Sequence, residues 1–233
     1  MQNNINVASN TSALTGANKV LRNTYALLGV SLFPTVIGAL IGMSIFAQSS
    51  PMSNIVQSSP IMFMLVTLAG IFGMFFLIRK NRNNSMGVVF LLGLTFLLGV
   101  MLGPILQVAF SMSNGGQIVS LAAGGTGVIF VTLAGIATTS KRDFSSMGKF
   151  LMIGLVLLIL AMLANMFFQI PALSLAISSI AVLIFSGFIL YDVNRIVRGG
   201  ETNYVMATLS LYLNIYNLFV HLLHLLMALM GRE

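Results

Sequence analysis

Three ionisable side chains, Asp192, His221 and His224, lie within the apolar segments of this 233-residue chain and are the first candidates for chemistry. A single acid cannot form the carboxylate pair that general acid and base catalysis uses. His221 and His224 are three residues apart, so they share one face of a helix. The sequence supplies no third and fourth ligand to make them a metal site. We therefore interpret the two histidines as packing or interface residues.

The depth of Asp192 depends on where its helix ends. If the helix stops at Tyr191, the carboxyl group lies at the cytoplasmic interface of a membrane. If the helix continues toward Arg198, the same group lies nearly two turns inside it. An acid within a membrane helix costs about 2.5–3.5 kcal/mol at the bilayer centre, so a buried Asp192 is expected to face a bundle interior or water.

In the second case Asp192 has a predictable neighbour across a helical hairpin. The turn is expected within residues 199–203. Asp192 lies eleven residues before Asn203, and Asn214 lies eleven residues after it. Residues equally far from a hairpin turn lie at similar depth, so Asp192 and Asn214 are predicted to be neighbours. The remaining candidates for a pH sensor or ion path are close to these two in sequence: Arg195, Tyr212 and Tyr216.

The chain shows no enzyme signature. Residues 124–127 (Gly-Gly-Thr-Gly) lack the Lys and Ser or Thr of a phosphate-binding loop. There is no Gly-x-Ser-x-Gly nucleophile turn. Cysteine is absent, which removes disulfides, thiolate metal sites and cysteine nucleophiles. A Ser–His protease would need a serine beside His221 or His224, and no motif selects one. We expect no catalytic activity and no cofactor.

Composition places these residues in a membrane protein. Hydrophobic residues make up 58% of the chain and charged residues 6%, against usual shares of about 45–50% and about 25%. So few charges cannot cover the surface of a soluble globule, whereas lipid is a suitable solvent for such a chain. The net charge of +7 is interpreted as a topology signal, with the lipid bilayer and not nucleic acid as the partner.

Seven stretches are long and apolar enough to cross a bilayer as helices, since about 20 residues span about 30 Å. The predicted fold class is an all-α membrane protein with seven transmembrane helices in a single bundle. The predicted spans are 24–46, 61–78, 86–106, 118–139, 150–168, 172–193 and 204–230.

The basic residues predict the orientation of these spans. Ten of the eleven Lys and Arg residues fall before the first span or in the connections after the second, fourth and sixth, and Arg232 alone falls on the other side. Basic residues stay on the cytoplasmic side during insertion. We predict a multi-pass membrane protein with a cytoplasmic N-terminus and a C-terminus outside.

Several glycines recur at helix-packing spacing, among them Gly38 with Gly42 and Gly99 with Gly103. Small residues allow two helix backbones to approach closely in lipid. Pro34 and Pro104 are expected to kink or break their helices.

Residues 1–18 are polar, rich in Asn, Ser and Thr, and free of Lys and Arg. They lack the charged start of a signal peptide. We predict a disordered cytoplasmic tail over 1–18 and a transmembrane domain over 19–233.

The last two spans resemble the Bax inhibitor family of seven-helix membrane proteins. The matching segments are 187–192 (Gly-Phe-Ile-Leu-Tyr-Asp), 199–204 (Gly-Gly-Glu-Thr-Asn-Tyr) with Ala207, and 211–219 (Leu-Tyr-Leu-Asn-Ile-Tyr-Asn-Leu-Phe). Residues 102–106 (Leu-Gly-Pro-Ile-Leu) are similar to another family feature. Residues 19–25, 164–173 and 199–204 resemble the family's bacterial branch, and the likeness covers nearly everything after the tail.

The resemblance implies two candidate activities. Some members of the family are pH-sensitive calcium leak channels, gated by two facing aspartates near the cytoplasmic side. One maps onto Asp192, but the other maps onto Asn214. Two close carboxylates share a proton, and an Asp–Asn pair has no such repulsion, so the departure bears directly on a pH switch.

The likeness to the bacterial branch implies a multi-pass protein of the bacterial inner membrane that binds and modulates FtsH, a membrane-anchored protease. Such a role needs a contact surface and an end that the protease can grip, which residues 1–18 would supply; a simple disordered terminus is the other interpretation of this tail. Three hypotheses follow: an FtsH modulator, a Ca²⁺ or other cation leak channel with Asp192 at its mouth, and an ion-coupled transporter. The last is disfavoured because coupling normally uses several buried ionisable groups.

Overall fold

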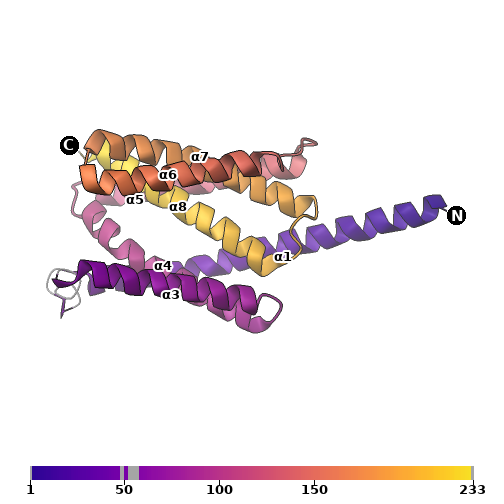
Figure 1. The fold of residues 1–233 in the computed structure, drawn as a ribbon, viewed down its shortest axis with the longest axis horizontal. Coiled ribbons are helices and arrows are strands. Elements are labelled where there is room, and N and C mark those ends of the chain that lie inside the picture. The colour runs from indigo at the N-terminus through magenta and orange to yellow at the C-terminus, as the bar shows by residue number, and fades with distance from the viewer. Residues whose placement is uncertain (1, 48–49, 52–57, 232–233) are drawn as a thin grey trace. The chain divides into compact units, whose positions relative to one another are not determined.

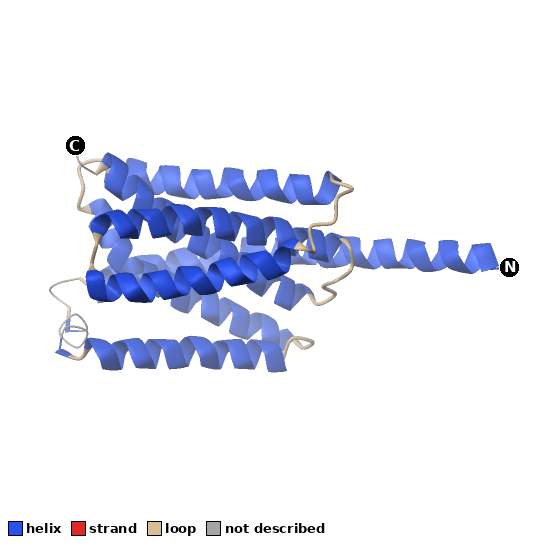
Figure 2. Cartoon of the chain, turned by 45° about the horizontal axis from the view of Figure 1, so that its top comes forward, coloured by secondary structure: helices blue, strands red, loops and turns tan. Residues whose placement is uncertain are grey.

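The computed structural model describes residues 2–47, 50–51 and 58–231. Seven long helices follow one another along the described residues, which contain no strand (Figures 1 and 2). They are α1 (Gln2–Ile45), α3 (Pro60–Lys80), α4 (Ser85–Phe110), α5 (Gly115–Thr139), α6 (Met147–Phe168), α7 (Pro171–Val197) and α8 (Tyr204–Met230).

Each helix contains a segment long and apolar enough to cross a membrane, which confirms the seven predicted spans. Apart from the start of the first span, every boundary lies within four residues of the expected one. The helix that contains the first span begins at Gln2, well before the expected start of the span at residue 24, because it continues through polar residues that precede the apolar run. The sixth continues to Val197, so the interpretation in which this helix ends at Tyr191 is wrong.

The backbone of α1 is helical from Gln2, where a disordered tail is predicted for residues 1–18. A polar extension of an existing helix gains one hydrogen bond per residue but is marginal in water without packing. The division of the chain at residue 18 stays a prediction about its behaviour in solution.

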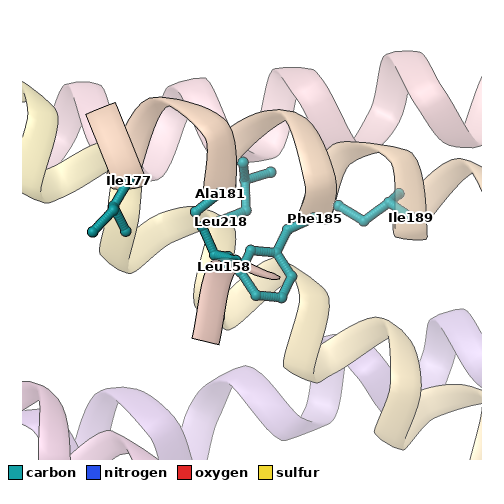
Figure 3. Packing of buried hydrophobic residues seen from close by; sticks show 6 residues of the cluster. All are labelled: Leu158, Ile177, Ala181, Phe185, Ile189 and Leu218. Carbon is teal, nitrogen blue, oxygen red and sulfur yellow. The ribbon is translucent and has the colours of Figure 1, made fainter. Parts of the chain in front are cut away.

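The chain forms two compact units, one made of Met1–Asn23 with Ser113–Glu233 and the other of Thr24–Met112. In the first unit α7 packs against α5, α6 and α8, and α5 also packs against α8. Four residues spaced by four along α7 form one buried stripe with Leu158 of α6 and Leu218 of α8 (Figure 3). This stripe comprises Ile177, Ala181, Phe185 and Ile189. We call these six residues the apolar cluster.

In the second unit, glycines bring α1 and α4 into backbone contact, as their spacing predicted. A Cβ atom added at Gly42 would overlap the backbone of Val100, and one at Gly99 would overlap the backbone of Thr35. Both helices continue through their prolines, Pro34 and Pro104, so neither proline breaks its helix.

Candidate functional site

The carboxyl group of Asp192 lies between α7 and α8. It is 8% exposed, and its Oδ2 atom accepts hydrogen bonds from Ser210 Oγ at 2.5 Å and from Asn214 Nδ2 at 2.8 Å. Ser210 and Asn214 are four residues apart on α8 and therefore present both donors on one face. The structure thus brings Asp192 and Asn214 together, and it adds Ser210, which sequence reasoning missed.

This geometry suits a carboxylate that acts only as an acceptor. Hydrogen bonds to an ionised group are shorter and stronger than neutral ones. Asn214 keeps this interaction in a position where a second carboxylate would repel the first. The carboxyl group of Asp192 is thus bonded by two neutral donors of α8 and by no second carboxyl group.

A cavity of about 20 Å³ lies beside Asp192, which is enough for one water molecule. Arg195 also lines it, but this side chain pairs with Glu201 (Nη2–Oε2 3.5 Å) and donates from Nε to the carbonyl of Gly200 at 3.2 Å. The other lining residues are Ile196, Glu201, Met206, Ala207 and Ser210.

The turn between α7 and α8 holds this site in register. Gly199 has a φ of +74°, and the amides of Gly199 and Gly200 bond back to the carbonyls of Ile196 and Arg195. This is the Schellman pattern, which glycine favours at a helix end. Asn203 then caps α8 by accepting the amide of Met206 at 3.0 Å.

The loop between α5 and α6 is fastened to the same end of α7. Asn194, 1% exposed, accepts the amide of Phe144 at 3.1 Å, and Arg198 donates to the carbonyl of Lys141 at 2.8 Å. Asp143 lies 3.7 Å from Arg198 Nε. These residues were not among the candidates. The signal for Asn194 is a polar residue inside an apolar helix, beside Asp192.

The two candidate tyrosines lie outside the cavity. Tyr212 is 2% exposed and stacks on Tyr216, with ring centroids 6.2 Å apart. Neither residue lines the space beside Asp192. Of the five candidates, Asp192, Asn214 and Arg195 are therefore grouped around the α7–α8 hairpin, whereas the tyrosines form a stacked pair on α8.

A second polar group occupies the other half of the α7–α8 pair. Ser178 Oγ lies 2.9 Å from His224 Nδ1 and 3.3 Å from His221 Nδ1. Sequence reasoning found the histidines but not their serine partner. The ring of His221 also stacks on Phe185, with centroids 6.0 Å apart. Three members of the apolar cluster, Ala181, Phe185 and Ile189, follow Ser178 on α7 and precede Asp192.

These features define a class: a polytopic helical membrane protein whose last two helices form a hairpin around one buried carboxylate. The sequence profile described as "Inhibitor of apoptosis-promoting Bax1" matches residues 17–231. The chain belongs to the Bax inhibitor family, which confirms the resemblance found in its motifs.

Relatives match over nearly their full lengths. An "Uncharacterized membrane protein" of Vibrio cholerae is 45% identical over 209 residues, 90% of this chain and 89% of the relative. The "Modulator of FtsH protease YccA" of Escherichia coli K12 is 39% identical over 215 residues, 92% of each chain. A protein of a second Escherichia coli strain has the same identity and coverage and is named "Inner membrane protein YccA". Together with its seven spans, this identifies the chain as a multi-pass inner-membrane protein.

Proposed function

We propose that this protein binds FtsH and modulates its activity, without catalysing a reaction itself. The observation that carries the proposal is the 39% identity to the Escherichia coli FtsH modulator over 92% of both chains. A match over 215 residues leaves room for the relative's contact surfaces to be shared. The proposal needs no catalytic residue, in keeping with the single intramembrane carboxylate.

The N-terminal segment offers an additional point of engagement. The helix α1 begins at Gln2, and residues 1–18 are polar and precede the apolar run of this helix. A short polar helical end of this kind is marginally stable in water. A processive protease must start on an unfolded chain, and this end can supply one at little cost in free energy.

Co-purification from detergent extracts tests the binding. Tagged protein crosslinked in membranes is expected to recover FtsH, whereas an unrelated seven-helix protein with the same tag and expression level is not. Failure to recover FtsH under crosslinking, with both proteins present in the membrane, would count decisively against the proposal.

The role of the tail is tested separately by following protein loss after synthesis is stopped. Deletion of residues 1–18 is expected to slow FtsH-dependent loss. A variant with the same eighteen residues in scrambled order is the matched control, and it is expected to restore the original rate because gripping depends on length and polarity. Equal rates for wild type and deletion would remove the tail from the proposal while leaving the binding test intact.

A cation leak is the second candidate function, and the observation that favours it is the buried Asp192 beside a cavity. The apolar cluster closes the α7–α8 interface above that carboxylate, so a path along this interface would require the cluster to open. The leak proposal predicts Ca²⁺ flux into liposomes that falls in Asp192→Asn. Asp143→Asn is the control, because it makes the same charge change at an exposed loop. Equal flux in all three proteins would exclude Asp192 as the mouth of a channel.

A further inference from the structure

The hydroxyl of Ser178 is shared by two imidazoles within the membrane-spanning part of the first unit. Ser178 is 2% exposed, and Nδ1 atoms from both histidines converge on its Oγ at 2.9 and 3.3 Å. Ser178 precedes Asp192 by fourteen residues on α7, which is about 21 Å along a helix. The apolar cluster lies between them, so this group is separate from the carboxylate site.

Hydrogen-bond counting restricts the protonation of this group. A serine hydroxyl has one proton to donate, and a neutral imidazole carries one N–H. If both Nδ1 atoms bond to the same oxygen, the hydroxyl donates to one of them and accepts from the other. The two histidines must then hold opposite tautomers, one protonated at Nδ1 and the other at Nε2. The shorter contact, to His224, is assigned as the bond that the hydroxyl donates.

We propose that Ser178, His221 and His224 form a proton-binding relay, in which the serine hydroxyl joins two imidazoles of complementary tautomer. A proton that binds at His221 Nε2 makes that ring an imidazolium. Its Nδ1 proton passes to Ser178 Oγ, the serine's own proton passes to His224 Nδ1, and His224 releases its Nε2 proton. One proton enters and one leaves, and both tautomers are reversed.

The relay has no acid of its own among the helices packed around it. Of these helices, α5 carries no titratable residue between Gly115 and Thr139, and the one such residue of α6, Lys149, lies in its first turn. On α7 the titratable residues are Tyr191, Asp192 and Arg195, at the far end of the helix from Ser178. On α8, besides the two histidines, they are Tyr204, Tyr212 and Tyr216, and Tyr216 stacks on Tyr212. The one acid of these helices, Asp192, belongs to the separate carboxylate site.

Histidine NMR on the full-length protein in lipid nanodiscs tests the relay. The chain has two histidines, so ¹⁵N-histidine labelling with a histidine-free purification tag gives two rings, which His221→Gln assigns. The expected result is one ring protonated at Nδ1 and the other at Nε2. Ser178→Ala is expected to remove the Nδ1-protonated tautomer, because its hydrogen-bond acceptor is lost.

The neighbouring serine provides a matched control. Ser179 Oγ bonds to the carbonyl of Leu175 in its own helix at 2.9 Å, so Ser179→Ala is expected to leave both tautomers unchanged. Ser178→Thr keeps the hydroxyl and is expected to keep them as well. Two rings of the same tautomer in the wild-type protein would overturn the proposal, and this measurement does not depend on whether Ser178→Ala folds. Unchanged tautomers in a folded Ser178→Ala protein would overturn it equally.

Discussion

Two neutral side chains of α8 hold the charge of Asp192, and Ser210 makes the shorter of the two contacts. If a buried carboxylate loses one of its hydrogen-bond donors, water does not fully replace that donor. The unsatisfied acceptor then costs about 1–3 kcal/mol. Ser210→Ala is therefore expected to lower the free energy of unfolding by that amount, measured by denaturant titration in detergent micelles.

The control for this substitution lies on the same helix. Asn217 Nδ2 donates at 2.8 Å to the carbonyl of Leu213 within α8, and that carbonyl already belongs to the helix ladder. Asn217→Ala is expected to change stability by less than about 0.5 kcal/mol, the usual range for a substitution away from such features. If both variants lost the same free energy of unfolding, the hydrogen bond from Ser210 to Asp192 would contribute no more than the Asn217 bond does.

Outside the membrane spans, stability is expected to depend on pH through Asp143, in the loop between α5 and α6. Hydrogen bonds from the side chain and then the backbone of Ser145 lower the pKa of Asp143, and the charge of Arg198 lowers it further. A carboxyl group with a lowered pKa binds its proton more readily in the unfolded chain. Its stabilising effect is therefore present above its unfolded pKa of about 3.9 and is lost as pH falls through the folded value.

Hydrogen exchange at the Ser145 amide, which Asp143 Oδ1 accepts at 2.8 Å, measures this effect. Above about pH 5, which is more than one unit above the ordinary pKa of Asp, the wild-type carboxyl group is ionised. In this range the Ser145 amide is expected to exchange faster in Asp143→Ala than in the wild type. The ratio of the two rates should approach one as the pH falls below the folded pKa. A ratio independent of pH would contradict the assignment.

Sequence counting could predict part of the site at this scale. Placing the hairpin turn near Asn203 put Asp192 opposite Asn214, which the hydrogen bond between them bears out. A count centred on Glu201 would also have found the missed partners, since Glu201 is nine residues from both Asp192 and Ser210 and 23 from both Ser178 and His224. Serine gives little signal by itself, because its hydroxyl can bond within its own helix, as Ser179 does.

At the scale of the element, the number of helices could be predicted because apolar runs of about 20 residues have few alternatives in a bilayer. The ends could not be predicted from apolarity alone. The apolar run of α7 fades near residue 193, yet the helix continues to Val197 because a Schellman turn at Gly199 ends it there. Glycine after a helix marks this kind of end, so it is a better guide than hydropathy.

The contact between α1 and α4 yields a prediction about glycine. A Cβ at Gly42 would overlap the backbone of Val100, whereas a Cβ at Gly29 on the same helix meets nothing within 4 Å. Overpacking costs about 1–3 kcal/mol, while alanine is favoured over glycine within a helix by about 0.5–1 kcal/mol.

Gly42→Ala is therefore expected to destabilise the protein by about 1–3 kcal/mol, and Gly29→Ala to be neutral or slightly stabilising. Thermal unfolding of both variants in detergent provides the comparison. Equal midpoints would mean that α1 and α4 separate without loss, against the close approach seen in the structure.

At the scale of the whole molecule, the last two helices place two polar groups at opposite ends of one interface with apolar residues between them. Asp192 interacts with uncharged donors at the hairpin end, and Ser178 joins two histidines in the other half. The apolar cluster separates them. The two groups therefore have separate hydrogen-bond networks within one helix pair.

The orientation of the molecule follows from charge counting and is the prediction with the widest consequence. If all seven candidate spans cross, the two ends of the transmembrane domain lie on opposite sides of the membrane. Ten of the eleven basic residues fall on the side predicted to be cytoplasmic. Because the chain contains no cysteine, single-cysteine variants report accessibility without background.

Asn83→Cys, next to Arg82, is expected to react with a membrane-impermeant maleimide only after spheroplasts are broken. Ser113→Cys and Arg232→Cys are expected to react in intact spheroplasts, because their segments follow the third and seventh spans. If Asn83→Cys and Arg232→Cys reacted from the same side, an odd number of the five predicted spans between them would not cross. FtsH modulation through the tail needs residues 1–18 on the cytoplasmic side, and two spans separate them from Asn83. Reaction of Asn83→Cys in intact spheroplasts would therefore remove that part of the proposed function.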